Sequence, residues 1–389
     1  MADRGKIISI VGARPQFIKL APLVRAFREK APKVEHVIVH TGQHYDYNMS
    51  KVFFEELGLP EPDFHLGVGS AEHGLQTALM LRKIEEVFLL NKPDRVIVYG
   101  DTNSTLAGAL AAAKLHIPVD HVEAGLRSYD RTMPEEINRA LTDHCSSILF
   151  CPTENAVNNL SKEGFSNIVN GGKLVEDTPR LTGKEPFVLN VGDIMYDSFL
   201  LCLGIAEKKS RIIEELSLKG EEYCLATVHR AENTDDETRL RNILEALNAI
   251  GKDTQVVFPM HPRTRKCLEK YDIRQRDLQG IRMIDPVSYF DMLILEKNAK
   301  VILTDSGGMQ KEAYFAGVPC ITLREETEWI ETVEAGWNFL VGADKSRINA
   351  AFQSGPSCQG EAGYGIGLTS TRIIEIIAHP NRDSNSLQS

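Results

Sequence analysis

The sequence predicts an α/β protein with two Rossmann-like, doubly wound domains that face each other across a cleft. Short runs rich in Val and Ile alternate with amphipathic stretches through most of the 389 residues. Continuously apolar strands are typical of a parallel sheet that is covered on both faces and joined by right-handed βαβ units. A Gly- and Pro-rich stretch over 171–186 interrupts the alternation, which resumes after residue 220.

Each series supplies five expected strands. In the first they lie at 7–11, 36–40, 95–99, 119–122 and 148–151, and in the second at 223–227, 255–259, 281–284, 300–303 and 319–322. We therefore expect an N-terminal domain over 1–190, a C-terminal domain over 191–367, a helix over 368–380 that packs back on the first domain, and a disordered tail over 381–389.

Composition excludes several classes of protein. Lys and Arg number 44 against 54 Asp and Glu, and this net charge of −10 disfavours general binding to nucleic acid. No apolar run is long enough to span a membrane, and the charged N-terminus does not look like a signal peptide. The 7 cysteines form no CxxC pair and no metal-ligand spacing is visible, so we expect reduced thiols, no metal and a cytoplasmic protein.

Two anion-binding turns are predicted, one in each half. Arg14 follows the first strand at the start of a helix and can hold an anion there, with Lys19 one turn further on. In the second half, Ser306, Gly307 and Gly308 separate a strand from a helix, which suits a phosphate or diphosphate, and Glu312 follows where ribose hydroxyls would lie. Neither turn has the GxGxxG or Walker spacing.

Three carboxylates come at or just after strand ends in the first half. Asp101 and Glu123 follow two expected strands, and Glu135 opens a helix that also carries Arg139. Crowded carboxylates shift one another's pKa values, so one can act as an acid while another acts as a base on a carbon-bound proton. The alternative is that they are solvated loop residues, with Asp101 a helix N-cap.

Histidines and a glutamine complete the candidates. His229 and Arg230 follow a strand of the second half and would add positive charge, and His261 follows the next strand. A lone histidine is often structural, and that alternative stays open for His229. Gln43 and His44 end the second expected strand.

Together, the runs GARPQFIK, TGQHYD, YGDTNSTLAGALAA, HVEAGLRS, MPEEINR, HRAEN and LTDSGGMQKEA resemble the non-hydrolysing UDP-N-acetylglucosamine 2-epimerases. The resemblance spans residues 6–378 and implies the glycosyltransferase-B arrangement, a homodimer, a UDP-sugar substrate, no cofactor, and inversion at C2 through elimination and re-addition of UDP. It implies the following roles: Asp101, Glu123 and Glu135 as acid/base groups, His229 beside the diphosphate, Arg14, Lys19, Arg139 and His261 in substrate binding, Ser306, Gly307 and Gly308 on the diphosphate, Glu312 on the ribose, and Gln43 and His44 as a possible allosteric site.

Two departures from the usual family pattern bear on the substrate. The chain has Trp329 where the family usually has Arg in a TERPE run, and Ile366 replaces Asp in the YGDG run. The Trp form looks more like the branch that acts on UDP-2,3-diacetamido-2,3-dideoxy-glucuronate for surface polysaccharide, whose extra carboxylate would suit a cation such as Lys311. The alternatives are UDP-N-acetylglucosamine as substrate, a hydrolysing epimerase, or a glycosyltransferase.

Overall fold

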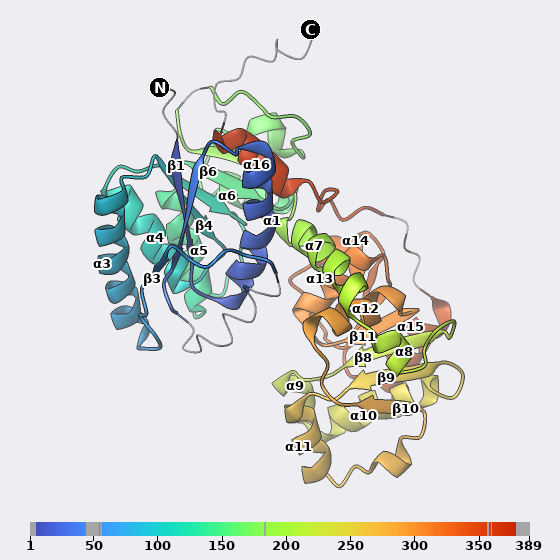
Figure 1. Cartoon of the computed structure of the whole chain (residues 1–389). Coiled ribbons are helices and arrows are strands. Elements are labelled where there is room, and N and C mark those ends of the chain that lie inside the picture. The colour runs from blue at the N-terminus through green and yellow to red at the C-terminus, as the bar shows by residue number, and fades with distance from the viewer. Residues whose placement is uncertain are drawn as a thin grey trace. The chain divides into compact units, whose positions relative to one another are not determined.

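The computed structural model describes residues 5–43, 54, 57–182, 184–355, 358 and 360–378. The chain divides into unit 1, made of Met1–Ser198 and Gly363–Ser389, and unit 2, made of Phe199–Ala362. Each unit contains one parallel sheet with helices around it (Figure 1), which confirms the predicted α/β class with two Rossmann-like units. The expected boundaries, after residues 190 and 367, lie near these divisions. His44 and the tail 381–389 lie outside the described residues.

Unit 1 has a seven-stranded sheet in the order β3-β2-β1-β4-β5-β6-β7. The strands are β1 (Lys6–Val11), β2 (Glu35–His40), β3 (Phe64–His65), β4 (Arg95–Tyr99), β5 (Val119–Val122), β6 (Ile148–Cys151) and β7 (Phe187–Asn190). The helices are α1 (Arg14–Lys30), α3 (His73–Asn91), α4 (Asn103–Lys114), α5 (Pro134–Cys145), α6 (Glu154–Lys162) and α16 (Thr369–Ala378), with a 3₁₀ turn η1 (Val169–Gly172). Helix α7 (Ile194–Lys209) begins in unit 1 and ends in unit 2.

Unit 2 has a six-stranded sheet in the order β10-β9-β8-β11-β12-β13. The strands are β8 (Tyr223–Thr227), β9 (Gln255–Pro259), β10 (Ile281–Ile284), β11 (Val301–Thr304), β12 (Cys320–Thr322) and β13 (Asn338–Leu340). The helices are α8 (Ile212–Glu215), α9 (Ala231–Thr234), α10 (Glu237–Ile250), α11 (Pro262–Lys270), α12 (Tyr289–Asn298), α13 (Gly307–Ala316), α14 (Ile330–Glu334) and α15 (Lys345–Ser354), with a 3₁₀ turn η2 (Gln275–Asp277).

The strands that the sequence did not predict are β3, β7 and β13. They have two, four and three residues and lie at an edge of their sheet, and runs this short carry little periodic signal. The ten predicted strands are all present, and most begin and end at the expected residue. Their apolar side chains are buried because helices cover both faces of each sheet.

Both sheets have a point where the strand order reverses. It lies between β1 and β4 in unit 1 and between β8 and β11 in unit 2. In open α/β sheets, ligands bind beyond the carboxyl ends of the two strands at such a point. The loops that follow these four strands, and the loop after β5 beside β4, are therefore the places to look for a site.

The C-terminal helix α16 belongs to unit 1 and packs against α1, as the red and blue helices side by side in Figure 1 show. Asp197 fixes its first turn by accepting hydrogen bonds from the Thr369 and Ser370 amides at 3.1 and 2.7 Å. A carboxylate suits this position because the first amides of a helix have no partner within the helix.

Within the residues that the structure describes, no helix combines the length and hydropathy needed to cross a membrane. The same part of the chain holds no group of three or more His, Cys, Asp or Glu side chains arranged to bind a metal ion.

Candidate functional site

The turn after β1 is held by Gln16, a residue that the sequence analysis did not single out. Its side-chain oxygen accepts hydrogen bonds from the Gly12 and Ala13 amides at 2.8 and 3.1 Å, and its Nε2 donates to the Tyr99 carbonyl at 3.0 Å. These amides therefore serve to tie β1 to β4. An anion at this turn would rely on the exposed side chain of Arg14 rather than on the backbone that the sequence suggested.

Glycine is required at the centre of this turn. A Cβ on Gly12 would lie 2.1 Å from the Thr41 hydroxyl and 2.2 Å from the Ser104 hydroxyl. No real contact is that short, so the close approach of β1, β2 and α4 depends on the missing side chain.

Two ion pairs lie at the ends of β4 and β5. The Lys19 ammonium pairs with the Glu123 carboxylate, and the Arg139 guanidinium pairs with Asp101. A Cβ on Gly100 would lie 3.1 Å from the Lys19 Nζ and 3.4 Å from the Glu123 Oε2, so the first pair sits directly beside the loop that carries Asp101. The structure thus brings four of the predicted residues together in unit 1.

Glu123 is held in an unusual backbone conformation. Its φ is +71°, in the left-handed region, which is unfavourable for residues that have a side chain. Such strained conformations are often found at functional sites. The nearby His121 ring is fully buried, with Nε2 2.7 Å from the Gly100 carbonyl and Nδ1 2.7 Å from the Asp143 carboxylate. His121 and Asp143 therefore support the two loops that carry Asp101 and Glu123.

Glu135 is placed differently from the other two carboxylates. It is exposed in the first turn of α5, and no described hydrogen bond or ion pair joins it to Asp101 or Glu123. The next residue, Glu136, is buried instead and accepts hydrogen bonds from the Ser128 and Tyr129 amides at 2.9 and 3.1 Å. Burial acts to raise the pKa of Glu136, but these hydrogen bonds and the Arg139 charge outweigh it and lower the pKa.

Gln43 contacts the first turn of helix α4, whose N-cap is Thr102. Its side-chain oxygen accepts hydrogen bonds from the Ser104 amide at 3.0 Å and the Ser104 hydroxyl at 2.6 Å. The structure therefore gives Gln43 a local role at the unit 1 strand ends. An allosteric role for Gln43 and His44 stays a prediction.

In unit 2, the turn between β11 and α13 is open at Gly308. Ser306 is the N-cap of α13, and its hydroxyl accepts a hydrogen bond from the Met309 amide at 3.4 Å. A Cβ on Gly308 would meet no atom within 4 Å, whereas a Cβ on Gly307 would lie 3.5 Å from a Glu328 carboxylate oxygen and 3.6 Å from an Arg230 nitrogen. The helix amides and the guanidinium favour a phosphate at this turn, and the Glu328 carboxylate opposes one.

Asp305 organises the neighbouring loop after β8. Its buried carboxylate accepts hydrogen bonds from the His229 and Arg230 amides, each at 3.0 Å, and from the Asn233 side chain at 3.2 Å. Asp305 belongs to the LTDSGGMQKEA run, in which the sequence assigned it no role. Its position directly after a strand, before Ser-Gly-Gly, was the available signal.

His229 does not carry the positive charge that the sequence suggested. Burial lowers its pKa, and the His261 ring and Arg230 lower it further, although the Asp305 carboxylate 3.2 Å away acts in the opposite direction. His229 is therefore neutral near pH 7, and the cationic group of this loop is Arg230. The His261 ring lies 5.3 Å from that of His229 and caps α11 by accepting a hydrogen bond from the Arg263 amide at 3.1 Å.

Trp329 is fixed against the start of α13. Its indole N–H donates to the Gly307 carbonyl at 2.8 Å, and the Lys311 ammonium lies 4.2 Å from the centre of its ring. Lys311 is only 5% exposed, so it supports the indole through a cation–π contact. A substrate carboxylate, for which the sequence suggested Lys311, would need a more accessible cation.

Glu312 is half-buried one turn into α13. The hydroxyl of Tyr289, which the sequence analysis missed, donates a hydrogen bond to its Oε1 at 2.8 Å. No local signal could have revealed this contact, because the two residues lie 23 positions apart on separate helices.

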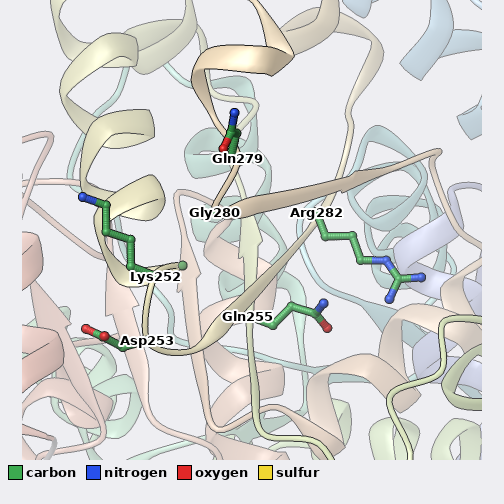
Figure 2. Close-up of a pocket in the computed structure, with 7 residues that line it drawn as sticks. Lys252, Asp253, Gln255, Gln279, Gly280 and Arg282 are labelled. Atoms are coloured by element: carbon green, nitrogen blue, oxygen red, sulfur yellow. The ribbon is translucent and has the colours of Figure 1, made fainter.

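A pocket of about 450 Å³ lies elsewhere in unit 2. It is lined by Gly251, Lys252, Asp253, Gln255, Gln279, Gly280 and Arg282, residues at or before the starts of β9 and β10. That is the amino edge of the sheet, opposite to His229 and Ser306. Figure 2 shows the Lys252 and Arg282 side chains pointing in different directions, so these charges do not converge on one ligand.

The sequence and the fold were compared with known proteins. Residues 26–378 match the family described as UDP-N-acetylglucosamine 2-epimerase. A relative from Methanococcus maripaludis, named as a UDP-N-acetylglucosamine 2-epimerase homolog, is 52% identical over 96% of this chain and 99% of its own. The UDP-2,3-diacetamido-2,3-dideoxy-D-glucuronate 2-epimerase of Pseudomonas aeruginosa is 48% identical over the same shares.

Solved structures agree with the sequence comparison. The UDP-GlcNAc 2-epimerase of Methanocaldococcus jannaschii superposes with a TM-score of 0.83 at 44% identity, over 96% of this chain and 99% of the other. A second structure of that enzyme, in complex with UDP-GlcNAc and UDP, gives a TM-score of 0.73 at 45% identity over the same shares. Matches of this extent, on a chain whose strand ends carry these carboxylates and this glycine turn, establish that the chain belongs to the UDP-N-acetylglucosamine 2-epimerase family.

Proposed function

We propose that the chain inverts C2 of a UDP-N-acetylglucosamine-type sugar without releasing the product as a free sugar. The observation that carries this proposal is the pair of ion-paired carboxylates, Asp101 and Glu123, at the ends of adjacent strands in unit 1. Family membership supports it, and so does the glycine turn of unit 2, which suits a diphosphate.

In the proposed reaction, one carboxylate takes the proton from C2 while the bond between C1 and the UDP oxygen breaks. The electron pair of the C2–H bond becomes the C1=C2 double bond of a 2-acetamidoglucal, and UDP leaves with the electron pair of the broken bond. The UDP oxygen then adds back to C1, and a second acid delivers a proton to the opposite face of C2.

The residues take the following proposed roles. One of Asp101 and Glu123 removes the C2 proton and the other delivers a proton to the opposite face. The ion pairs with Arg139 and Lys19 hold these two carboxylates in position. Glu135, which is exposed on α5, is the third acid/base candidate. In unit 2 the amides of Gly307 and Gly308 hold the diphosphate, Glu312 accepts hydrogen bonds from the ribose, and neutral His229 donates one to the departing phosphate.

For the substrate, we propose UDP-2,3-diacetamido-2,3-dideoxy-glucuronate, with UDP-N-acetylglucosamine as the alternative. The P. aeruginosa relative supports the first sugar, and the M. jannaschii enzyme supports the second. Trp329 also supports the first, because the Trp form of this run resembles the branch that acts on that sugar, and its indole is held against the Gly307 carbonyl. Arg230, which is exposed beside the glycine turn of unit 2, is a candidate partner for a substrate carboxylate, and the exposed Arg14 of unit 1 is a second candidate.

The test is a turnover assay with each sugar in deuterated water. The proposal expects deuterium at C2 of both epimers and no net accumulation of free UDP. Steady accumulation of UDP with a free sugar would favour a hydrolysing epimerase, and UDP release that depends on an acceptor, without exchange at C2, would favour a glycosyltransferase. The homodimer and the role in surface polysaccharide stay predictions from the resemblance, and light scattering tests the first.

A further inference from the structure

Glu296, on helix α12, is a buried carboxyl group to which the reaction above assigns no role. Its exposed fraction is 0%. Among the described residues, neither of its carboxyl oxygens has a hydrogen-bond partner. A buried group without a hydrogen bond costs stability, and a buried charge without a partner costs far more, so a carboxyl in this position favours its neutral form.

The neighbours of Glu296 supply no compensating positive charge. The titratable groups that act on it or feel its charge, in the described part of the chain, are Tyr223 on β8, Tyr289 on α12, Glu312 on α13 and Cys320 on β12. Elsewhere on α12, the Lys297 ammonium forms an ion pair with Glu207, and the Asp291 carboxylate accepts a hydrogen bond from the Ser210 hydroxyl. Burial raises the pKa of Glu296 well above its ordinary value, and the Glu312 carboxyl raises it further.

Glu312 is the partly exposed member of this group. It lies on α13, which packs against α12, and the Tyr289 hydroxyl donates to its Oε1 at 2.8 Å. Burial and the Glu312 charge both raise the pKa of Tyr289, so this hydroxyl keeps its proton and remains a donor. Cys202 on α7 also faces Tyr289 and is buried.

We propose that Glu296 is a positioning residue: as a neutral carboxylic acid behind Glu312, it leaves Glu312 as the single anionic acceptor for the ribose hydroxyls of a uridine nucleotide. The inference rests on the proposed function, because it takes Glu312 as the ribose contact. When alkaline solution removes the buried proton, two like charges face each other across the α12–α13 contact. Glu312 is then displaced from Tyr289, and nucleotide affinity falls.

The experiment is a calorimetric titration of the full chain with UDP at a series of pH values from about 7 to 10. Glu296→Gln keeps the shape of the side chain and is neutral at every pH. We expect the two proteins to bind UDP within about threefold of each other at pH 7, and the wild type to lose about tenfold more affinity than E296Q at the alkaline end. Ionisation of the uracil ring affects both proteins equally and cancels in the comparison.

Two further measurements separate positioning from a purely structural role. Tyr289→Phe removes the donor to Glu312 and should weaken UDP binding at every pH, while leaving the alkaline loss in place. Without ligand, the thermal stability of E296Q relative to wild type should grow as the pH rises above about 4.5. Above that pH the unfolded wild type loses the Glu296 proton, whereas the folded wild type must still keep it, so folding of the wild type becomes progressively less favourable.

The outcomes distinguish the two proposals. Parallel UDP affinity profiles for wild type and E296Q, or a stability difference that does not change with pH, would overturn the role of Glu296 and leave the epimerase proposal intact. If the wild type binds no UDP at any pH, the proposed function itself fails, and the inference about Glu296 fails with it.

Discussion

The two sheets follow the same strand order, apart from the seventh strand of unit 1, but the side chains at their strand ends differ. Around the switch point of unit 1, charged side chains are matched in pairs, Lys19 with Glu123 and Arg139 with Asp101. At that of unit 2, the turn before α13 carries two glycines, and the buried Asp305 carboxylate is turned towards the backbone of its own loops.

Under the proposed function, this difference would let one scaffold serve two kinds of chemistry. Proton transfer needs carboxylates that are held still and are not buried without a partner, so each is paired with a cation. Binding of a diphosphate needs open amides and a positive field. In unit 2 the Asp305 carboxylate is enclosed by N–H donors of its own loops, and the Glu328 carboxylate, which lies beside Gly307, would have to be offset by Arg230.

The largest effect is expected in unit 1. Asp101→Asn and Glu123→Gln each remove a proton-transfer group while keeping its shape, so C2 exchange should fall by about 10²–10⁴-fold. UDP affinity should change little, because these side chains are assigned to the sugar. Deuterium incorporation and calorimetry measure the two quantities.

Glu135→Gln ranks the third carboxylate against the other two. Because Glu135 is exposed and makes no described contact with them, equal losses in all three variants would mean that α5 repositions Glu135 when the substrate binds. Unchanged exchange in both D101N and E123Q would rule out the assignment of the chemistry to unit 1.

The next effect is expected in unit 2. Gly308→Asp places a negative charge at the open start of α13, where it favours the helix itself but repels a diphosphate. UDP affinity should fall by about 10- to 100-fold with no loss of thermal stability. Gly308→Ala is the matched control and should bind UDP almost as well as wild type, and equal binding by G308D would argue against a diphosphate at this turn.

A smaller effect, on stability, is expected at Asp305. Asp305→Ala leaves the amides of His229 and Arg230 and the side chain of Asn233 without their acceptor, so the free energy of unfolding should fall by about 2–4 kcal/mol. Urea denaturation measures it. The pKa of His229 should also fall further, because Asp305 acts to raise it, and an unchanged imidazole titration by NMR would contradict that link.

The smallest effect depends on pH. The folded-state pKa of Glu136 is lowered, so its ionised form stabilises unit 1 above the unfolded pKa of about 4.5, and this contribution disappears as the pH falls through the folded value. Glu136→Gln should therefore cost about 1–2 kcal/mol at pH 7 and progressively less in acid. Denaturation curves at several pH values test this, and a constant difference between the two proteins would be the contrary result.

The sequence alone determined the class of the fold, ten of the described strands, and the residues that follow the strand ends. These features are local: apolar runs mark buried strands, and glycine or acidic residues directly after them mark the loops at one sheet edge. The motifs around Asp101, Glu123 and Ser306 also sufficed to identify the family, because their order along the chain is itself specific.

Only the tertiary structure decided which of these groups act on one another. Pairing of Lys19 with Glu123, enclosure of Asp305, neutrality of His229 and burial of Glu296 all join residues that are distant in sequence or depend on exclusion of water. Electrostatic energies are set by distance and by the surrounding dielectric, and neither can be read from the order of residues in a chain.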